Sequence, residues 1–434
     1  MQAVIMAGGK GTRLRAITND TIPKPMALVA GKPILLWQIE QLRDQKIQDI
    51  ILIIGHLGYK IRDFFGDGRN FGVNIRYIEE STPLGTAGAL ALLPPLLNQE
   101  DFFLIFGDVL FDIDLQRMAR YHTEKGADVT LFVHPNIHPF DSDLVVCNDS
   151  GRVKYFDSKH NVRNYWYRNC VNAGFYIMKR SVCDRVPMNF KVALEKDLLT
   201  SMIEDGCPIF GYCSPEYIRD VGTVDRIIHA ESEIASGFIA SKNLRNKQKA
   251  IFLDRDGTIN KKNGLVYTEK QFELEDNAVE AIRKINASGY LAIVITNQPV
   301  VARGLCQMED VERIHMKMET LLGREGVYLD EIKFCPHHPD KGYPEENPLY
   351  KIPCRCRKPD IGMIQECVEK FNIDLTQSWM VGDTTVDIQT GKNAGTHTAL
   401  VLTGEAGSDK KYPVTSDLIC KDLLSAVNAI IDYA

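Results

Sequence analysis

Residues 251–260 read IFLDRDGTIN, an apolar run that leads into two carboxylates separated by one residue. Such a run is typical of a buried strand, and it places Asp254 and Asp256 at the strand's carboxyl end. An unaccompanied Asp-x-Asp is more often an ordinary acidic turn. Here three further polar motifs follow in order, which favours a functional site over a turn: Thr296-Asn297-Gln298, Arg357-Lys358-Pro359 and Gly382-Asp383-Thr384.

Short apolar runs separated by helical stretches recur along the whole chain. This alternation is expected of parallel α/β sheets, and the runs fall into two groups that predict two separate sheets. The predicted strands are 4–6, 50–54, 74–78, 102–106 and 129–133 in the first half and 250–253, 291–296, 331–334, 378–381 and 398–401 in the second. Residues 230–240 are predicted to be helical, and 241–249 (SKNLRNKQK) are polar and basic. We therefore expect an α/β protein of two domains, 1–240 and 250–434, joined by a linker at 241–249.

The composition of the chain excludes several classes of protein. Its 434 residues are 44% hydrophobic and 25% charged, with 51 Lys+Arg against 57 Asp+Glu, which is ordinary for a globular protein. A mildly acidic chain offers no broad basic face for nucleic acid. No apolar stretch approaches the roughly 20 residues of a membrane span, and no signal peptide follows Met1. We expect a cytoplasmic protein that binds small anionic molecules, with neither nucleic acid nor a membrane as partner.

Three of the eleven cysteines lie near one histidine in a pattern of metal ligands. Cys335 and His337 form one pair, and Cys354 and Cys356 form another after a loop of 16 residues. Four such ligands leave no open position, so the spacing predicts a structural zinc site that pins the loop. The other cysteines are scattered, which suits a reducing compartment. Free thiols without metal are the weaker alternative.

Together, the four polar motifs of the second half resemble those of the haloacid dehalogenase phosphatases. The resemblance implies a Rossmann-like domain in which Asp254 attacks phosphorus, while Asp256 protonates the leaving oxygen and then deprotonates a water. Thr296 and Lys358 would neutralise the phosphoryl oxygens. The implied Mg²⁺ ligands are Asp254, Asp256 (through a backbone carbonyl near it) and Asp383. Asp387 is more simply interpreted as a helix-start carboxylate.

The predicted zinc loop narrows this resemblance to phosphatases of heptose 1,7-bisphosphate and of histidinol phosphate. Residues 302–304 (Ala-Arg-Gly) resemble the heptose group, in which Arg303 and Arg357 would bind a second phosphate and Asn297 would contact substrate. Pro299-Val300 replaces the Ser-Gly that is usual there. Histidinol phosphate or another sugar phosphate is therefore an alternative substrate.

Residues 4–14 of the first half read VIMAGGKGTRL, a predicted strand that runs into a glycine-rich loop. Glycines let the backbone approach phosphate oxygens closely, and Arg13 and Lys24 add positive charge. The loop matches neither of the common glycine-rich nucleotide motifs, and alone it fits a tight turn equally well.

Other motifs accompany this loop: Pro23-Lys24-Pro25, Thr82–Gly88 (TPLGTAG), Gly107-Asp108, Asn172-Ala173-Gly174, Glu195-Lys196-Asp197 and Asp220-Val221-Gly222-Thr223. In combination they resemble the sugar-1-phosphate nucleotidylyltransferase family, and residues 14–27 are most similar to guanylyltransferases for manno-configured sugars. The resemblance implies that a sugar 1-phosphate attacks the α-phosphorus of a nucleoside triphosphate and releases pyrophosphate. Catalysis would then rest on positioning and charge neutralisation.

The same resemblance implies which residues take part. The triphosphate and the reacting phosphate would be held by Gly8, Gly9, Gly11, Arg13 and Lys24. The base would lie against Gly85 and Thr86. Mg²⁺ would be bound by Asp108, beside the nucleotide, and by Asp220. The sugar phosphate would face Asn172, Glu195 and Lys196.

The two implied activities fit consecutive steps. Removal of the 7-phosphate from D-glycero-α-D-manno-heptose 1,7-bisphosphate would yield a heptose 1-phosphate, which the first half would join to GMP from GTP. One alternative pairs a mannose-1-phosphate guanylyltransferase with a phosphatase of unrelated specificity. Another makes the first half a nucleotide-sugar sensor without catalysis, although the retained Arg13, Lys24, Asp108 and Asp220 count against it. The sequence leaves the oligomeric state open.

Overall fold

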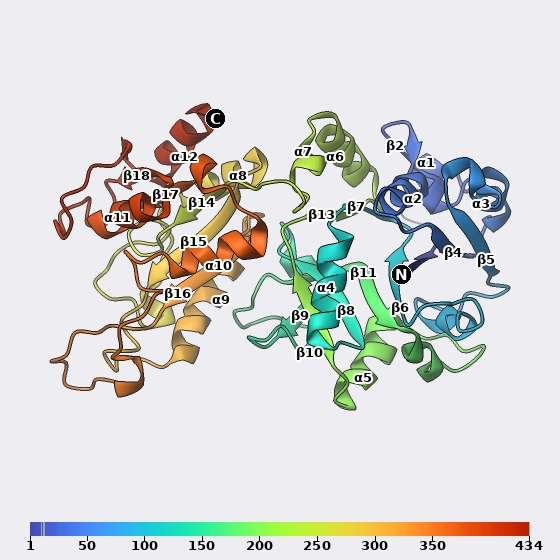
Figure 1. Ribbon diagram of the computed structural model, residues 1–434, viewed down its shortest axis with the longest axis horizontal. Helices are drawn as coiled ribbons and strands as arrows, with labels where there is room; N and C mark the ends of the chain where they lie inside the picture. The colour runs from blue at the N-terminus through green and yellow to red at the C-terminus, as the bar shows by residue number, and fades with distance from the viewer. Residues whose placement is uncertain (10, 12–13, 434) are drawn as a thin grey trace. The chain divides into compact units, whose positions relative to one another are not determined.

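The computed structural model describes residues 1–9, 11 and 14–433, and the chain forms two compact units (Figure 1). The N-terminal unit contains residues 1–134, 143–158 and 171–243. The C-terminal unit contains the chain from residue 244 onward together with 135–142 and 159–170. Each unit has its own sheet and helices, which confirms the predicted class of a two-domain α/β protein. The sequence division assigned 135–142 and 159–170 to the first half, because nothing in their composition marks them as part of another unit.

The N-terminal unit is built on a mixed sheet. Its strands are β1 (Gln2–Met6), β4 (Asp49–Ile54), β5 (Asn74–Glu79), β6 (Asp101–Phe106), β8 (Val129–His134), β9 (Leu144–Cys147), β10 (Val153–Asp157), β11 (Val171–Lys179) and β12 (Ile209–Cys213). Their order is β10-β9-β11-β6-β1-β4-β5, and β8 joins β11 to β12. The expected parallel pairing holds for β6, β1, β4 and β5. The sheet departs from the expected all-parallel arrangement at β11, which was not among the predicted strands and runs antiparallel to β6 and β8.

Helices and two small ribbons complete this unit. The helices are α1 (Arg15–Thr18), α2 (Ile34–Asp44), α3 (Gly58–Phe65), α4 (Leu115–Lys125), α5 (Thr200–Glu204), α6 (Val224–Ala235) and α7 (Phe238–Ser241). The ribbons pair β2 (Leu28–Val29) with β3 (Lys32–Pro33) and β7 (Val109–Asp112) with β13 (Tyr217–Asp220). The helix expected at 230–240 is interrupted, because Gly237 takes a left-handed φ of 73° between α6 and α7.

Helix α2 shows how the core positions the functional loops of this unit. Leu35, Ile39 and Leu42 recur at helical spacing and pack into the core against the sheet. Gln38, on the same helix and buried, donates to the carbonyls of Phe106 and Val109 at 2.8 and 2.6 Å. These two hydrogen bonds from Gln38 therefore hold the turn between β6 and β7, which carries Asp108.

The C-terminal unit has a parallel sheet, as expected. Its strands are β14 (Ala250–Leu253), β15 (Leu291–Asn297), β16 (Glu331–Cys335), β17 (Trp379–Gly382), β18 (His397–Val401) and β19 (Leu418–Cys420), in the order β16-β15-β14-β17-β18-β19. The helices are α8 (Ala278–Ser288), α9 (Met308–Arg324), α10 (Gly362–Phe371), α11 (Thr385–Ala394) and α12 (Leu423–Tyr433). Every strand pairing between these strands is parallel.

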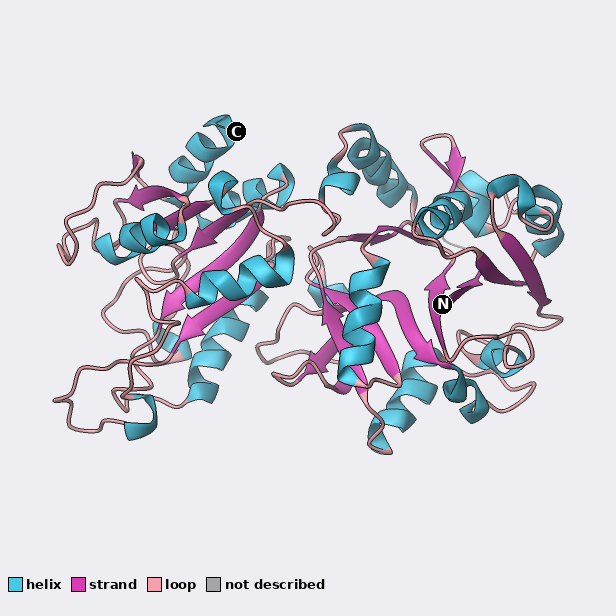
Figure 2. Cartoon of the chain, viewed as in Figure 1, coloured by secondary structure: helices cyan, strands magenta, loops and turns pink. Residues whose placement is uncertain are grey.

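Alternate residues of each central strand enter different cores. Ile251 and Leu253 pack with residues of α8, α9 and α12, whereas Ala250 and Phe252 pack with residues of α10. The sheet is therefore covered on both faces (Figure 2), which explains why its central strands β14 and β17 are apolar. This arrangement leaves the carboxyl ends of the strands for a site. Within the described part of the chain, no helix combines the length and the apolar character that a membrane span requires.

Candidate active sites

The carboxyl ends of the central strands in the C-terminal unit bring several acidic side chains together. The Asp254 backbone N–H follows β14 and donates to the Val381 carbonyl of β17 at 2.9 Å. Asp383 directly follows β17, and Asp387 lies in the first turn of α11. Carboxylate oxygens of Asp254, Asp383 and Asp387 lie within 4.8 Å of one another. The structure thus groups Asp254 with Asp383 and adds Asp387.

Lys358 reaches this acidic group from the loop before α10. Its Nζ lies 2.8 Å from Asp254 Oδ1 and 2.5 Å from Asp387 Oδ1. The side-chain amide of Asn297 accepts from the Lys358 backbone N–H at 3.0 Å and donates to the Lys358 carbonyl at 3.1 Å. Asn297 was expected to contact substrate, and its amide here holds the backbone of Lys358. The buried Thr296 hydroxyl lies one residue earlier, where it accepts from Gln298 Nε2 at 3.1 Å.

The electrostatics of this group favour a divalent cation. Burial raises the pKa of Asp383 to about 7, and the charges of Asp254 and Asp387 add to the shift. The cation Lys262, whose Nζ is 3.2 Å from Asp383 Oδ2, does not offset it. Asp383 Oδ1 is buried and accepts no hydrogen bond from the described residues. A hard cation relieves this repulsion and prefers carboxylate oxygens, so the residues fit Mg²⁺.

The carboxylate of Asp256 lies outside this acidic group. The magnesium ligand expected here was a backbone carbonyl near Asp256, and that expectation stays a prediction. The Asp256 carboxylate accepts from Arg255 Nη2 at 2.8 and 2.9 Å, from Gln298 Nε2 at 2.8 Å and from Asn260 Nδ2 at 3.0 Å. Burial would raise the pKa of Asp256, but Arg255 and the two amides outweigh burial and lower it. These donors therefore hold the carboxylate ionised and fix its orientation in the substrate-free protein.

Asp387 has a second contact besides the helix-start role that the sequence suggested. Its Oδ2 accepts from the Thr384 backbone N–H at 3.1 Å and from the Thr384 hydroxyl at 2.5 Å, which caps the start of α11. Its Oδ1 faces Lys358. The helix-start interpretation is correct but incomplete.

Arg255 and His315 belong to the site and were missed. Arg255 is fully buried and connects Asp256 to Gln298 and to His315 of α9. Because a buried arginine requires a paired charge, its place between Asp254 and Asp256 was a usable signal. His315 has no such signal in the sequence.

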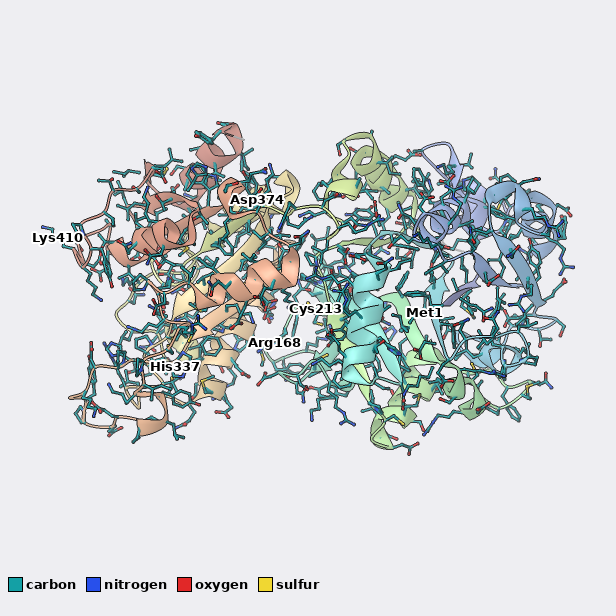
Figure 3. The ribbon with its side chains drawn as sticks, in the orientation of Figure 1. Met1, Arg168, Cys213, His337, Asp374 and Lys410 are labelled. Carbon is teal, nitrogen blue, oxygen red and sulfur yellow. The ribbon has the colours of Figure 1, made fainter. Side chains whose placement is uncertain are left out.

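The four predicted zinc ligands converge at the end of β16, where Figure 3 labels His337. Cys356 Sγ lies 3.2 Å from Cys354 Sγ, 3.3 Å from Cys335 Sγ and 3.4 Å from His337 Nδ1. A disulfide would require about 2.05 Å. With Zn–S bonds of about 2.3 Å, sulfurs around a tetrahedral ion lie about 3.8 Å apart. The donor set and its spacing are therefore close to those of a zinc site.

Positive side chains gather beside this cysteine cluster. Arg357 Nη1 donates to the His337 carbonyl at 2.9 Å. The Arg303 guanidinium and the Lys351 ammonium lie 4.4 and 4.9 Å from the ring centroid of Tyr343. Arg303 Nε and Lys351 Nζ are buried and make no hydrogen bond within the described residues, although Lys351 Nζ lies 3.7 Å from Glu346. Cations held in this way suit an anionic group, and Lys351 was not foreseen.

In the N-terminal unit, the glycine-rich loop follows β1 and packs against Lys24. Gly11 has a φ of +61°, and a Cβ there would lie 2.6 Å from Lys24 Cβ. A Cβ at Gly8 would lie 2.6 Å from Glu80 Oε2, whereas Gly9 has open space around it. The close approaches at Gly8 and Gly11 explain why glycine is needed at those two positions. Arg13, expected at the triphosphate, lies outside the described residues.

Lys24, Asp108 and Asp220 come from three segments that meet at the β7–β13 ribbon. Lys24 Nζ contacts Asp108 Oδ2. The Val221 backbone N–H donates to the Asp108 carbonyl at 2.9 Å, which places the turns containing Asp108 and Asp220 side by side. Asp220 Oδ2 accepts from Arg226 Nη1 at 2.7 Å. Two carboxylates from adjacent turns suit a magnesium ion, with Lys24 as their neighbour.

The loop with Gly85 and Thr86 packs on the segment 190–194. Gly85 has a φ of +83°, and a Cβ there would lie 2.5 Å from the Val192 carbonyl. Thr86 Oγ1 accepts from the Leu194 backbone N–H at 2.8 Å. The hydroxyl that was expected beside the base thus joins two loops.

Asn172 and Glu195, both expected to face the sugar phosphate, lie in hydrogen-bonding contact. Asn172 Nδ2 donates to Glu195 Oε1 at 3.0 Å, and the Tyr176 hydroxyl donates to the same oxygen at 2.5 Å. Glu195 and Lys196 lie in a π-helical turn, Leu194–Leu199, a conformation frequent at functional sites. Tyr176 was missed, since a tyrosine inside an apolar strand looks like a core residue.

Comparison with known proteins agrees with the division of the chain into an N-terminal and a C-terminal unit. The family model for nucleotidyl transferases matches residues 2–237, and the HAD-hydrolase-like model matches 355–426. A mannose-1-phosphate guanylyltransferase of Mycobacterium tuberculosis is 33% identical over 246 residues, 56% of this chain and 67% of its own.

Two further relatives are phosphatases. They are D-glycero-β-D-manno-heptose-1,7-bisphosphate 7-phosphatases of Pasteurella multocida, 40% identical over 39% of this chain and 86% of its own, and of Haemophilus ducreyi, 38% identical over 42% and 99%. The chain is therefore a fused enzyme that belongs to the nucleotidyl transferase family over residues 2–237 and, in its C-terminal part, to the HAD-like phosphatases.

Proposed function

We propose that the C-terminal unit removes the 7-phosphate of D-glycero-α-D-manno-heptose 1,7-bisphosphate and that the N-terminal unit transfers GMP from GTP to the resulting heptose 1-phosphate. The observation that carries this proposal is the pairing of relatives in one chain. A phosphatase relative named for a heptose bisphosphate matches over 99% of its length, and a guanylyltransferase relative matches the other half. The product of the first reaction would be the substrate of the second. GTP is a cytoplasmic metabolite, so we place both reactions there.

In the phosphatase reaction, Asp254 is the nucleophile. Its Oδ attacks the 7-phosphorus, the bond from phosphorus to the sugar oxygen breaks, and an aspartyl phosphate forms. Asp256, oriented by Arg255, would take up a proton as the anionic phosphate group of the substrate enters, pass it to the departing oxygen and later accept one from the attacking water. Lys358 lies beside Asp254, and together with the Thr296 hydroxyl it would neutralise the phosphoryl oxygens. Mg²⁺ bound by Asp254 and Asp383, with Asp387 beside them, would add charge neutralisation at the same oxygens.

In the transfer reaction, the chain's residues orient two substrates. Lys24, which contacts Asp108, would turn to the α-phosphate, and Asp108 and Asp220 would hold Mg²⁺, which would neutralise charge on the phosphates. Asn172 and Glu195, already hydrogen-bonded together, face the sugar phosphate with Lys196. The sugar 1-phosphate oxygen then attacks the α-phosphorus and pyrophosphate leaves, with no protein nucleophile.

A second candidate function is guanylyl transfer to mannose 1-phosphate. The Mycobacterium tuberculosis relative favours it, because that protein is named for this sugar and matches over 67% of its own length. The fused phosphatase favours a heptose instead. The phosphatase relatives are named for the β anomer, whereas guanylyltransferases of manno-configured sugars suggest the α anomer. Sugar and anomer are therefore tested together.

The deciding experiment offers the purified protein each anomer of heptose 1,7-bisphosphate, with GTP, ATP, CTP or UTP in separate reactions. We expect phosphate release from the α anomer and formation of a GDP-heptose only with GTP. A parallel reaction contains mannose 1-phosphate and GTP. GDP-mannose as the sole nucleotide sugar would overturn the heptose assignment in favour of the second candidate.

Metal content tests the proposed cofactors. We expect about one zinc ion per chain, which is retained after dialysis because four protein ligands enclose it. We expect both activities to stop in EDTA and to return with Mg²⁺, since magnesium sites keep several waters and exchange readily. Protein that is fully active without zinc would contradict the structural zinc assignment.

A further inference from the structure

Two segments from the first half of the sequence belong to the C-terminal unit. Residues 135–142 and 159–170, here called the arm, cover one side of α9. Arg168, labelled in Figure 3, lies in the second segment. The Haemophilus ducreyi phosphatase matches over 99% of its own length within 187 residues, about the length of the chain from β14 onward. A phosphatase of this family is thus complete without the arm, which is an addition in the fused chain.

The second segment of the arm is hydrogen-bonded to α9 through its backbone. The Tyr167 N–H donates to Thr320 Oγ1 at 2.9 Å, and the same hydroxyl lies 3.0 Å from the Tyr167 carbonyl. The Asn169 N–H donates to Glu319 Oε1 at 3.3 Å. Thr320 is fully buried, so these bonds are shielded from water.

Side chains extend this contact along the helix. The Trp166 indole N–H donates to Glu269 Oε2 at 2.9 Å, and the ring lies between Lys317 and Arg324, 5.6 and 5.5 Å from its centroid. Pro139, in the first segment, packs on Gly323, where a Cβ would lie 2.5 Å from Pro139 Cγ. The arm therefore contacts the last two turns of α9 at several points.

The same helix touches the phosphatase site through His315. His315 precedes Glu319 by four residues, so both side chains lie on one face of α9. His315 Nε2 lies 3.2 Å from Arg255 Nη1, and Arg255 Nη2 donates to both carboxylate oxygens of Asp256. Burial and the charge of Arg255 hold the pKa of His315 well below its usual range, so the neutral ring accepts from Arg255.

We propose that the arm is a positioning element of the phosphatase: by fixing α9 it holds His315 against Arg255, and Arg255 in turn orients Asp256. This inference rests on the proposed role of Asp256 in proton transfer. His315, Arg255 and Thr320 are positioning residues, because none of them reaches the reacting phosphate except through Asp256. Loosening the arm therefore lowers kcat for phosphate release and leaves KM unchanged.

The test uses the full chain with Thr320→Val, which keeps the shape of the side chain but removes the hydroxyl that holds Tyr167. Thr123→Val is the matched control, because Thr123 on α4 also bonds a carbonyl four residues earlier, at 3.0 Å. Phosphate release from heptose 1,7-bisphosphate and from p-nitrophenyl phosphate gives kcat and KM. We expect kcat to fall about tenfold in Thr320→Val, the scale of coupling between connected sites. KM and nucleotidyl transfer stay as in the control.

Two further variants separate positioning from a loss of folding. Thr320→Ser retains the hydroxyl and restores kcat to within about twofold of the unmodified chain, whereas a merely structural defect would persist. In a His315→Leu background, Thr320→Val has little additional effect, because both act through Arg255. Should Thr320→Val not fold, Trp166→Phe loosens the arm from its exposed side and lowers kcat in the same direction.

The outcomes distinguish this inference from the proposed function. If the unmodified chain hydrolyses neither substrate, the proposed phosphatase function fails and the inference fails with it. If the unmodified chain is active and Thr320→Val matches Thr123→Val in kcat, only the role of the arm is overturned. Equal loss in Thr320→Ser and Thr320→Val also overturns it, since the hydroxyl would then not be the connection.

Discussion

The two active sites differ in how much of their geometry the chain completes by itself. In the C-terminal unit, buried hydrogen bonds hold each group in place: Asn297 fixes Lys358, and Arg255 with Gln298 fixes Asp256. In the N-terminal unit, the groups come from loops and pair with one another, as Lys24 does with Asp108. Binding of a nucleotide would have to separate that pair.

This difference follows from the chemistry that each site is proposed to perform. A protein nucleophile has to be aimed before the substrate arrives, so its supports are built into strand ends. A reaction between two bound substrates depends on groups that the substrates help to arrange. Single mutations should therefore have large effects in the phosphatase site, whereas in the nucleotidyl transferase site the effects of paired residues should be coupled.

The largest expected effect is the loss of phosphate release in Asp254→Asn. A carboxamide cannot form the acyl phosphate, so we expect the rate to fall by at least roughly 10³-fold while nucleotidyl transfer is unchanged. Phosphate release and GDP-sugar formation are measured on the same preparation, with Asp149→Asn, an exposed turn residue, as control. Release within tenfold of the unmodified chain would contradict the nucleophile assignment.

Asp108→Ala should act on the other site alone. Loss of a proposed magnesium ligand should lower nucleotidyl transfer by about 10²-fold, the usual scale for one charge-stabilising group. Because Lys24 contacts Asp108, the combined Lys24→Ala and Asp108→Ala variant should lose much less than the sum of the single losses. Undiminished transfer in Asp108→Ala would show that the assignment of Asp108 as a magnesium ligand is wrong.

Cys356→Ser is expected to act indirectly. Cys356 lies within 3.4 Å of the other three donors of the cluster, so its loss should release zinc and loosen the loop before Arg357 and Lys358. We expect phosphate release to fall roughly tenfold to a hundredfold, as for residues that support a site from outside. The control is Cys367→Ser, a buried cysteine outside the cluster. Zinc content measured beside activity shows whether the two losses coincide.

The sequence predicted much of this molecule because its motifs lie at strand ends. The parallel strands that precede Asp254 and Asp383 were foreseen from apolar runs alone, since a buried parallel strand is apolar on both faces. The antiparallel strand β11 was not, because strand direction depends on tertiary pairing. Spacing identified the Cys-His cluster, for its ligands are close along the chain.

What the sequence did not reveal depends on contacts between distant segments. The hydrogen bonds that Gln298 and Asn260 donate to Asp256, beside those of Arg255, form only in the folded unit, and the sequence did not predict them. His315 and Tyr176 lie in a helix and a strand where their spacing fits a core position. The arm was missed for the same reason, since no local signal tells which unit a loop will join.

The smallest expected effect is a pH dependence of magnesium activation. In the metal-free protein, burial and the neighbouring carboxylates raise the pKa of Asp383 from 3.8 to about 7. A proton therefore competes with Mg²⁺ for this group. Below pH 7 the apparent affinity for Mg²⁺ should weaken by up to about tenfold for each pH unit. The Mg²⁺ concentration for half-maximal phosphate release, measured from pH 8 to pH 6, checks this expectation.

The same shift has a defined sign for stability. A raised carboxyl pKa means that the folded state holds the proton more tightly than the unfolded state does. The stabilisation is complete below about pH 3.8 and is lost as the pH rises through about 7. The Tm of the metal-free protein should fall across this window more than that of Asp383→Asn, and saturating Mg²⁺ should remove the difference at its upper end.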